Sequence, residues 1–254
     1  MNAKEKKAVA VRDNITIVLN KPKYPGNIGS VARAAKNMGF TNISVVKRGQ
    51  TDIEEIMPEI RKMATHLAGD TVDRIRFFET LEQAVCDSNY IIGTTSRFGT
   101  ARQPVTGPEE MASGLIELSQ NNKVAIVFGP EDFGLTNQEL QLCHEFVAIP
   151  TADDLKSLNL SHAVMVICYV IFTASSESKD FFAPKLATSE EIEGMYGQLK
   201  EMFIKIDFIN PENPDYWMSH VRRFFSRILL YSKEVQIIRG ICRQVLWYNS
   251  NKKT

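Results

Sequence analysis

The sequence has little that marks a metal site, a secreted protein or a membrane protein. Its four cysteines lie far apart without a C-x-x-C pair, so neither a zinc site nor a disulfide framework is indicated, and we expect reduced, mostly buried thiols. Mean hydropathy is −0.17, and no apolar run approaches the roughly 20 residues that span a bilayer. The first residues lack the apolar core of a secretory signal. A soluble, cytoplasmic protein without metal or membrane partner is expected.

Two glycine-containing turns lack the fingerprints of nucleotide-binding folds. The run G-N-I-G-S-V-A at 26–32 follows an apolar stretch, but the middle glycine of G-x-G-x-x-G is missing. The run F-G-P-E-D-F-G-L at 128–135 lacks the Lys and Ser or Thr that follow the second glycine of a P-loop. Neither a Rossmann dinucleotide enzyme nor a P-loop triphosphatase is therefore expected.

The chain also lacks an excess of either charge, with 30 basic and 30 acidic residues. Between residues 218 and 248, however, six basic residues face a single acidic one, Glu234, which leaves this segment with a net charge of +5. A local basic segment in a neutral chain favours an RNA partner for that segment. Among its residues we expect four arginines to contact RNA: Arg222, Arg223, Arg227 and Arg243.

Short β-branched runs alternate with helical patterns through the first two thirds of the chain. The runs lie at 14–20, 42–47, 75–79, 89–95, 123–129 and 145–150. This alternation predicts an α/β fold, with a parallel sheet covered by helices on both faces. We expect a catalytic domain at 1–175, a polar linker at 176–188 and a helical extension at 189–254, with helices near 189–207, 215–231 and 233–249.

Three turns, in order, carry a resemblance to a known family. They read P-G-N-I-G-S-V-A-R at 25–33, F-G-P-E-D-F-G-L at 128–135 and I-P-T-A-D-D-L-K-S-L-N-L-S-H-A-V at 149–164. They resemble the three motifs of the SPOUT class (SpoU/TrmH-type) of RNA 2′-O-ribose methyltransferases, and the likeness is nearest to the TrmJ-type tRNA methyltransferases. It runs from about residue 14 to 169, and the segment at 237–248 resembles the last helix of that group.

The resemblance implies a deep trefoil knot in the C-terminal part of the sheet, S-adenosylmethionine bound at the knot loops, and a homodimer whose substrate site spans two subunits. It further implies methylation of tRNA at cytidine or uridine 32 of the anticodon loop. Two alternatives remain at this point: a SPOUT enzyme for another tRNA or rRNA nucleotide, and a non-catalytic RNA-binding relative.

The motifs, carried over position by position, imply two sets of site residues. The set assigned to catalysis is Asn27, Arg33, Glu131, Ser157 and Asn159. The set assigned to the cofactor is Thr94, Thr95, Ser96, Gly129, Glu131, Gly134, Ile149, Pro150, Ser157, Leu158 and Asn159. Arg33 is a poor base because a guanidinium group stays protonated at neutral pH. We assign it to RNA contact and to stabilising the developing alkoxide.

The residues themselves leave several roles open. Glu131 can hold its loop closed or contact RNA. One of Ser157, Asn159 and Ser161 is expected to cap the following helix, and His162 is expected to be structural. The basic helices can dock tRNA or simply cover apolar surface. Tyr169 is followed by Val170, where the family commonly has Glu, a departure that touches no proposed catalytic group.

Overall fold

A computed structural model describes residues 10–95, 105–152, 154, 157–175 and 185–251. The chain divides into two compact units, residues 1–183 and 184–254. The first unit is built on a parallel sheet of seven strands in the order β3-β2-β1-β6-β4-β7-β5. The strands are β1 (Ile15–Asn20), β2 (Ile43–Val46), β3 (Arg76–Phe78), β4 (Tyr90–Thr94), β5 (Val105–Thr106), β6 (Val124–Phe128) and β7 (Glu145–Val147).

The six strands predicted from apolar runs are all present and all parallel. They form because β-branched and aliphatic side chains fill both faces: every residue of β2 and β6 is buried. The sequence did not reveal β5, because two residues are too few to show a period. The α/β parallel-sheet prediction is confirmed.

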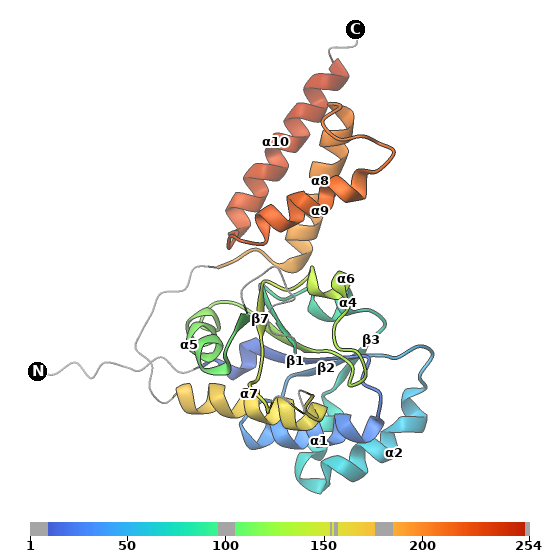
Figure 1. Cartoon of the computed structure of the whole chain (residues 1–254), viewed down its shortest axis with the longest axis vertical. Helices are drawn as coiled ribbons and strands as arrows, with labels where there is room; N and C mark the ends of the chain where they lie inside the picture. The colour runs from blue at the N-terminus through green and yellow to red at the C-terminus, as the bar shows by residue number, and fades with distance from the viewer. Residues whose placement is uncertain (1–9, 96–104, 153, 155–156, 176–184, 252–254) are drawn as a thin grey trace, which may run out of the picture. The chain divides into compact units, whose positions relative to one another are not determined.

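Helices cover both faces of this sheet (Figure 1). The helices of this unit are α1 (Pro25–Asn37), α2 (Ile53–Ala64), α3 (Gly69–Asp73), α4 (Leu81–Val85), α5 (Pro108–Leu118), α6 (Asn137–Leu140) and α7 (Leu160–Ala174), with short 3-10 turns at Arg12–Asn14 and His66–Ala68. The first helix packs against α2 and α7, and α5 also packs against α7. No helix in the described ranges is long and apolar enough to cross a membrane.

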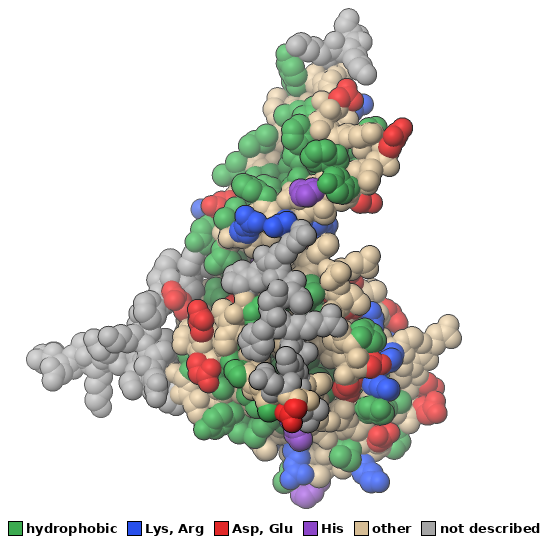
Figure 2. Space-filling model, viewed as in Figure 1, with side chains coloured by type: hydrophobic (Ala, Val, Ile, Leu, Met, Phe, Trp, Pro, Cys, Tyr) green, Lys and Arg blue, Asp and Glu red, His purple; other side chains and the backbone are tan. Residues whose placement is uncertain are grey.

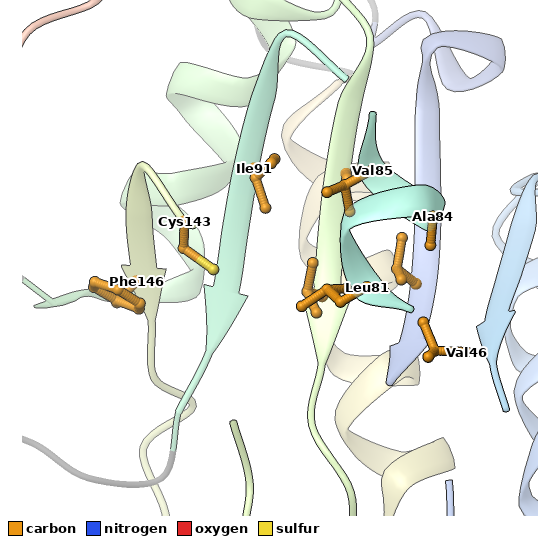
Figure 3. Close-up of a cluster of buried hydrophobic side chains, with 10 residues drawn as sticks. Val46, Leu81, Ala84, Val85, Ile91, Cys143 and Phe146 are labelled. Carbon is orange, nitrogen blue, oxygen red and sulfur yellow. The ribbon is translucent and has the colours of Figure 1, made fainter. Parts of the chain in front are cut away.

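The core on the α4 face joins residues that are distant in sequence (Figure 3). Leu81 and Val85 of α4 pack over Val18, Val46 and neighbouring strand residues, and these four are at most 2% exposed. Such burial stabilises a domain by about 25 cal/mol per Å² of apolar surface removed from water. The carboxyl ends of the strands are thereby held at fixed separations, which positions the loops that follow them.

The second unit contains α8 (Ser189–Lys205), α9 (Pro214–Phe225) and α10 (Ser232–Asn251). The helix predicted at 215–231 ends six residues earlier than expected. The reason is that the chain turns so that Leu230 accepts a hydrogen bond from Ala187 N at 2.8 Å and Tyr231 bridges to Leu186. Residues 186–188, assigned to the linker from the sequence, therefore contact this unit, and Thr188 caps α8 through a capping box with Glu191.

A half-buried histidine, His144, joins the last strands of the sheet. The backbone N of His144 donates to Ile91 O at 2.8 Å, while its ring Nδ1 accepts from Ile91 N at 3.0 Å. The ring stacks on Tyr90, whose hydroxyl donates to Glu145 at 3.2 Å. Glu145 also accepts from Thr106 at 2.7 Å, so β4, β7 and β5 share one polar cluster. Burial lowers the pKa of His144 from 6.5 to about 4.

We expect this histidine to make stability depend on pH. The unfolded chain takes up a proton near pH 6.5, whereas the folded chain resists it until about pH 4. Stability is therefore fully present above pH 6.5 and falls as pH drops toward 4, by roughly 2 to 4 kcal/mol. The substitution His144→Asn, which keeps an acceptor but cannot titrate, should flatten urea-unfolding free energies across this window. His66→Asn, at an exposed position, should leave the pH dependence of the unfolding free energy unchanged. If both variants show the same pH dependence, His144 is not its source.

Candidate functional site

The three motif loops meet at the carboxyl edge of the sheet, where ligands of open parallel sheets bind. The first motif is the turn between β1 and α1, the second follows β6, and the third leads from β7 into α7. Pro25 occupies the first turn of α1, where a missing N–H costs nothing. Gly29 lets α2 approach, because a Cβ there would lie 2.1 Å from Ile60 O. The second glycine of the first motif therefore serves helix packing.

Glu131 links the second motif to the first. One of its carboxylate oxygens accepts from Asn27 Nδ2 at 2.7 Å, and the other accepts from the backbone N of Lys23 at 2.8 Å. Both donors belong to the β1–α1 turn, which lies more than 100 residues earlier in the chain. Hydrogen bonds to an ionised carboxylate are among the stronger ones in proteins. Of the two roles left open for Glu131, holding loops together is the one with contacts in this structure.

Asn159 connects the third motif to the same chain of hydrogen bonds. Its Nδ2 donates to Asn27 Oδ1 at 3.3 Å, so the Asn27 amide bridges Glu131 and Asn159. Its Oδ1 accepts from the backbone N and the hydroxyl of Ser161, at 2.9 and 2.7 Å. Asn159 is therefore the residue that caps α7, as expected of one of the three candidates. Residues from all three motifs thus form one polar network.

A second link joins the turn after β1 to α6, the short helix that follows the second motif. Lys21 donates to Glu139 at 2.9 Å, and the second oxygen of Glu139 accepts from Thr136 N at 2.8 Å within a capping box. Lys21 holds a left-handed backbone, with φ of 52°, which a lysine rarely adopts. Burial opposes ionisation of Glu139, but these hydrogen bonds, aided by Asn20, hold its pKa below its usual value. No motif in the sequence marks this pair, so it could not be predicted.

The loop after β6 has the shape of a cofactor cradle. A Cβ on Gly129 would lie 2.6 Å from the backbone of Gly134 and Leu135, so the loop closes tightly on itself. Gly134 has φ of 70° and donates to Pro130 O at 2.9 Å, while open space surrounds the position of its missing side chain. The loop after β6 therefore leaves space beside its backbone at Gly134, where a ligand can approach the chain closely.

The structure places the other residues assigned to the cofactor as follows. Thr94 ends β4, and its hydroxyl donates to Val127 O at 3.1 Å, while Thr95 N donates to Val147 O at 3.0 Å. Ser96 lies outside the described residues. Along the third motif, Pro150, Ser157 and Asn159 are exposed, and Ile149 and Leu158 are half-buried. The hydrogen bonds of Thr94 and Thr95 connect neighbouring strand ends. The loops after β6 and β7 therefore remain the main candidates for cofactor contacts.

Arg33 lies apart from this network. It is exposed on α1 and forms no hydrogen bond or ion pair with any residue that the structure describes. All five of its guanidinium donors are therefore unused by the described residues. His162, on the first turn of α7, is likewise exposed.

The four arginines assigned to RNA fall into two groups. Arg222 forms a bidentate pair with Glu193, at 2.5 and 2.6 Å, and lies 4.4 Å from the centroid of the Tyr196 ring. The hydrogen bonds to Glu193 raise the pKa of Arg222, so its charge is already engaged within the helical unit. Arg223, Arg227 and Arg243 are exposed. We therefore remove Arg222 from the RNA-contact set and keep the other three.

Exposed aromatic residues accompany these arginines on α9. On the face in view, hydrophobic side chains gather over the helical unit (Figure 2). Tyr216, Trp217 and Phe224 of α9 are 56%, 47% and 65% exposed. Aromatic rings together with arginines form surfaces on which unpaired bases stack. The signal that could have found them is their helical position, because at 100° per residue all three lie roughly 100 to 160° around α9 from the buried Met218.

Comparisons with known proteins agree with this arrangement. Residues 14–169 match the SpoU rRNA Methylase family, and residues 190–254 match the C-terminal domain of the tRNA methyltransferase TrmJ. The chain belongs to the SpoU methylase family. It is 36% identical to the tRNA (cytidine/uridine/adenosine-2′-O-)-methyltransferase TrmJ of Pseudomonas aeruginosa, with 90% of this chain and 92% of that one covered. With the tRNA (cytidine/uridine-2′-O-)-methyltransferase TrmJ of Salmonella typhimurium, identity is 34% and the covered shares are 94% and 99%.

Solved structures show the same fold. TrmJ from Z. mobilis ZM4 superposes with a TM-score of 0.76 at 27% identity, covering 91% of this chain and 98% of that one. The SpoU methyltransferase AviRb from Streptomyces viridochromogenes, solved with AdoMet, shares the fold with a TM-score of 0.52 at 17% identity, and covers 70% of this chain and 63% of its own. The resemblance of the three motifs to the SpoU/TrmH-type methyltransferases is therefore confirmed. The likeness to the TrmJ type is confirmed as well.

The pair of Lys21 and Glu139 yields a stability prediction. Glu139→Gln should lower the free energy of unfolding of the first unit by about 1 to 2 kcal/mol, because a largely buried carboxylate loses charge-assisted hydrogen bonds. The matched control is Glu55→Gln, an exposed residue on α2, which should change stability by less than about 0.5 kcal/mol. Urea unfolding followed by circular dichroism measures both, and equal values would show that the pair does not hold the turn.

Proposed function

We propose that this protein transfers a methyl group from S-adenosylmethionine to the 2′-hydroxyl of a tRNA nucleotide. The observation that carries the proposal is the single hydrogen-bond network that joins the three motifs through Glu131, Asn27 and Asn159. The names of the relatives support tRNA and ribose 2′-O-methylation. The TrmJ-type resemblance supports cytidine or uridine 32 of the anticodon loop as the target, and tRNA as a substrate supports a cytoplasmic location.

The bound cofactor supplies an activated methyl group, so the protein's task is alignment and exclusion of water. Gly129 and Gly134 shape the loop that would hold it, together with residues of the third motif. Asn27, fixed by Glu131 on one side and Asn159 on the other, presents the first turn of α1 to the ribose. Ser157, which is exposed and not needed as a helix cap, faces cofactor or ribose.

Arg33 acts on the substrate. It is unpaired among the described residues and belongs to α1, which packs against α7. We propose a homodimer in which Arg33 of one subunit stabilises the alkoxide that develops beside the cofactor of the other. The exposed Tyr169 and Phe172 of α7, 53% and 40% exposed, contribute apolar surface to this interface. The trefoil knot that the resemblance implies belongs to the same proposal.

Arg33→Ala should abolish methyl transfer while changing cofactor affinity less than tenfold, as measured by calorimetry and by radioactive methyl incorporation into tRNA. Gly134→Trp should abolish activity by filling the cofactor loop. When the two inactive variants are mixed and allowed to exchange subunits, mixed dimers should recover about a quarter of wild-type activity, because half of the dimers carry one intact site. No recovery between variants that demonstrably exchange subunits would contradict a site shared by two subunits. A tenfold loss of cofactor affinity in Arg33→Ala would instead place Arg33 in the cofactor site.

The helical unit docks tRNA in this proposal. Arg223, Arg227 and Arg243 contact phosphates, and the exposed rings of Trp217 and Phe224 stack unpaired bases. The alternative role, covering apolar surface, is performed by a separate set of residues: Met195, Met218 and Val235 are buried within the unit. The unit therefore has its own core and does not need its arginine-bearing surface to fold.

The double variant Arg223→Gln/Arg227→Gln should weaken tRNA binding and leave cofactor affinity unchanged. It should also flatten the salt dependence of binding by up to about 0.7 to 0.9 for each phosphate interaction that the variant removes. The charge-matched control Lys185→Gln/Lys205→Gln removes two exposed lysines of the same unit and should have a smaller effect. Filter binding across a range of salt concentrations measures both, and equal salt slopes in the two double variants would show that these arginines are only a solvated helix face.

The target nucleotide itself is tested by mapping ribose methylation by mass spectrometry in tRNA from cells with and without the protein. We expect one ribose methyl group, at cytidine or uridine 32, to disappear when the protein is absent. A methyl group that disappears from another tRNA or rRNA position would assign the protein to a different substrate of the same reaction.

A further inference from the structure

A small pocket lies beside the proposed reaction site and has no role in it so far. It measures about 110 Å³ and lies between the turn after β1, the carboxyl end of β2 and the start of α2. Part of its wall is apolar and is formed by Pro22, Pro25, Ile28, Ile56 and Phe77. A cavity of this size is smaller than the roughly 300 to 1,000 Å³ of drug-sized sites, so it suits a single flat group.

The remaining side chains of the pocket give it a positive rim. Lys23, Lys47 and Arg48 line it, and no carboxylate among the described residues does. Two of these cations are paired with acids outside the lining: Arg48 contacts Asp132 Oδ2 at 2.9 Å, and Lys47 contacts Glu79. Both pairs are partly exposed, and such pairs contribute little to stability, so an incoming phosphate can replace either acid at small cost. Until a phosphate binds, the two ion pairs hold Lys47 and Arg48 at the rim of the pocket.

The pocket is continuous with the motif network through shared residues. Lys23, whose side chain lines the pocket, donates its backbone N to Glu131. Pro25 and Ile28 of the lining flank Asn27 on the first turn of α1. Asp132, which holds Arg48, directly follows Glu131. If one ribose of an RNA strand lies at Asn27, a neighbouring nucleotide of the same strand can therefore reach this pocket.

We propose that this pocket binds a nucleotide next to the methylated one, with its base between the apolar walls and its phosphate on Lys23, Lys47 and Arg48. The inference rests on the proposed function for its choice of RNA as ligand. An apolar slot with a cationic rim matches a nucleotide, which combines a flat weakly polar base with a negative charge. The pocket would then set where the strand lies, and so which ribose reaches Asn27.

Two variants test the pocket, each with a matched control. Ile56→Trp fills it without changing charge, and Ile53→Trp makes the same substitution three residues earlier, outside the lining. Lys47→Gln/Arg48→Gln removes two rim charges, and Lys62→Gln/Arg74→Gln removes two exposed charges elsewhere in the unit. We expect the pocket variants, but not the controls, to raise the KM for tRNA roughly tenfold, with kcat and cofactor affinity nearly unchanged.

Cross-linking gives a readout independent of activity. Unmodified tRNA transcripts containing 4-thiouridine, irradiated with the wild-type protein, should cross-link to peptides that contain residues 45–51 or 77. Wild-type methylation with pocket variants equal to their controls, and no such cross-link, would overturn the pocket proposal and leave the proposed function intact. Cross-links in the pocket without methylation of any tRNA would overturn the proposed function and keep the pocket.

Two further outcomes of the same experiments are decisive. Loss of dimer mass in Ile56→Trp, with RNA binding per subunit unchanged, would assign the pocket to a protein contact and refute the proposal. If Ile56→Trp does not fold, the double glutamine variant and the cross-links decide.

Discussion

The arrangement of the site depends on one carboxylate. Glu131 accepts from the backbone of Lys23 and from the amide of Asn27, and thereby joins two loops that are far apart in the sequence. Because Asn27 also binds Asn159, the same link reaches the third loop. A carboxylate has enough lone pairs to serve two donors at once, and its charge strengthens both bonds. The contacts of Glu131 in this structure therefore hold the two loops together.

The sheet makes this link possible by bringing the loops to one edge. In a parallel sheet every carboxyl end lies on the same side, so β1, β6 and β7 deliver their loops together. The polar cluster of His144, Tyr90, Glu145 and Thr106 links β4, β7 and β5 on the outer half of the sheet. Desolvation of the histidine ring lowers its pKa there, so the stability of this part of the sheet depends on pH.

Charge is divided between structural pairs and free cations in both units. Arg222 is engaged by Glu193 and Tyr196 and stabilises the helical unit, while Arg223 and Arg227, one and five residues further on, are exposed to solvent. In the first unit, Lys21 is engaged by Glu139, whereas Arg33 makes no hydrogen bond or ion pair among the described residues. A chain of zero net charge therefore still has exposed arginines without an acidic partner among the described residues. They lie where the proposal places RNA.

The sequence by itself determined the element types, the parallel sheet and the family, because apolar periodicity and ordered motifs are local properties of the chain. It also located Asn27, Glu131 and Asn159, but it left the role of Glu131 open and could not show that the three side chains touch. It did not reveal β5, because two residues are too few to show a period, nor the Lys21–Glu139 and Arg222–Glu193 pairs, because each joins residues distant in sequence. Only the tertiary structure decided these, because a hydrogen bond or an ion pair forms between groups that the fold brings within about 3 Å of each other.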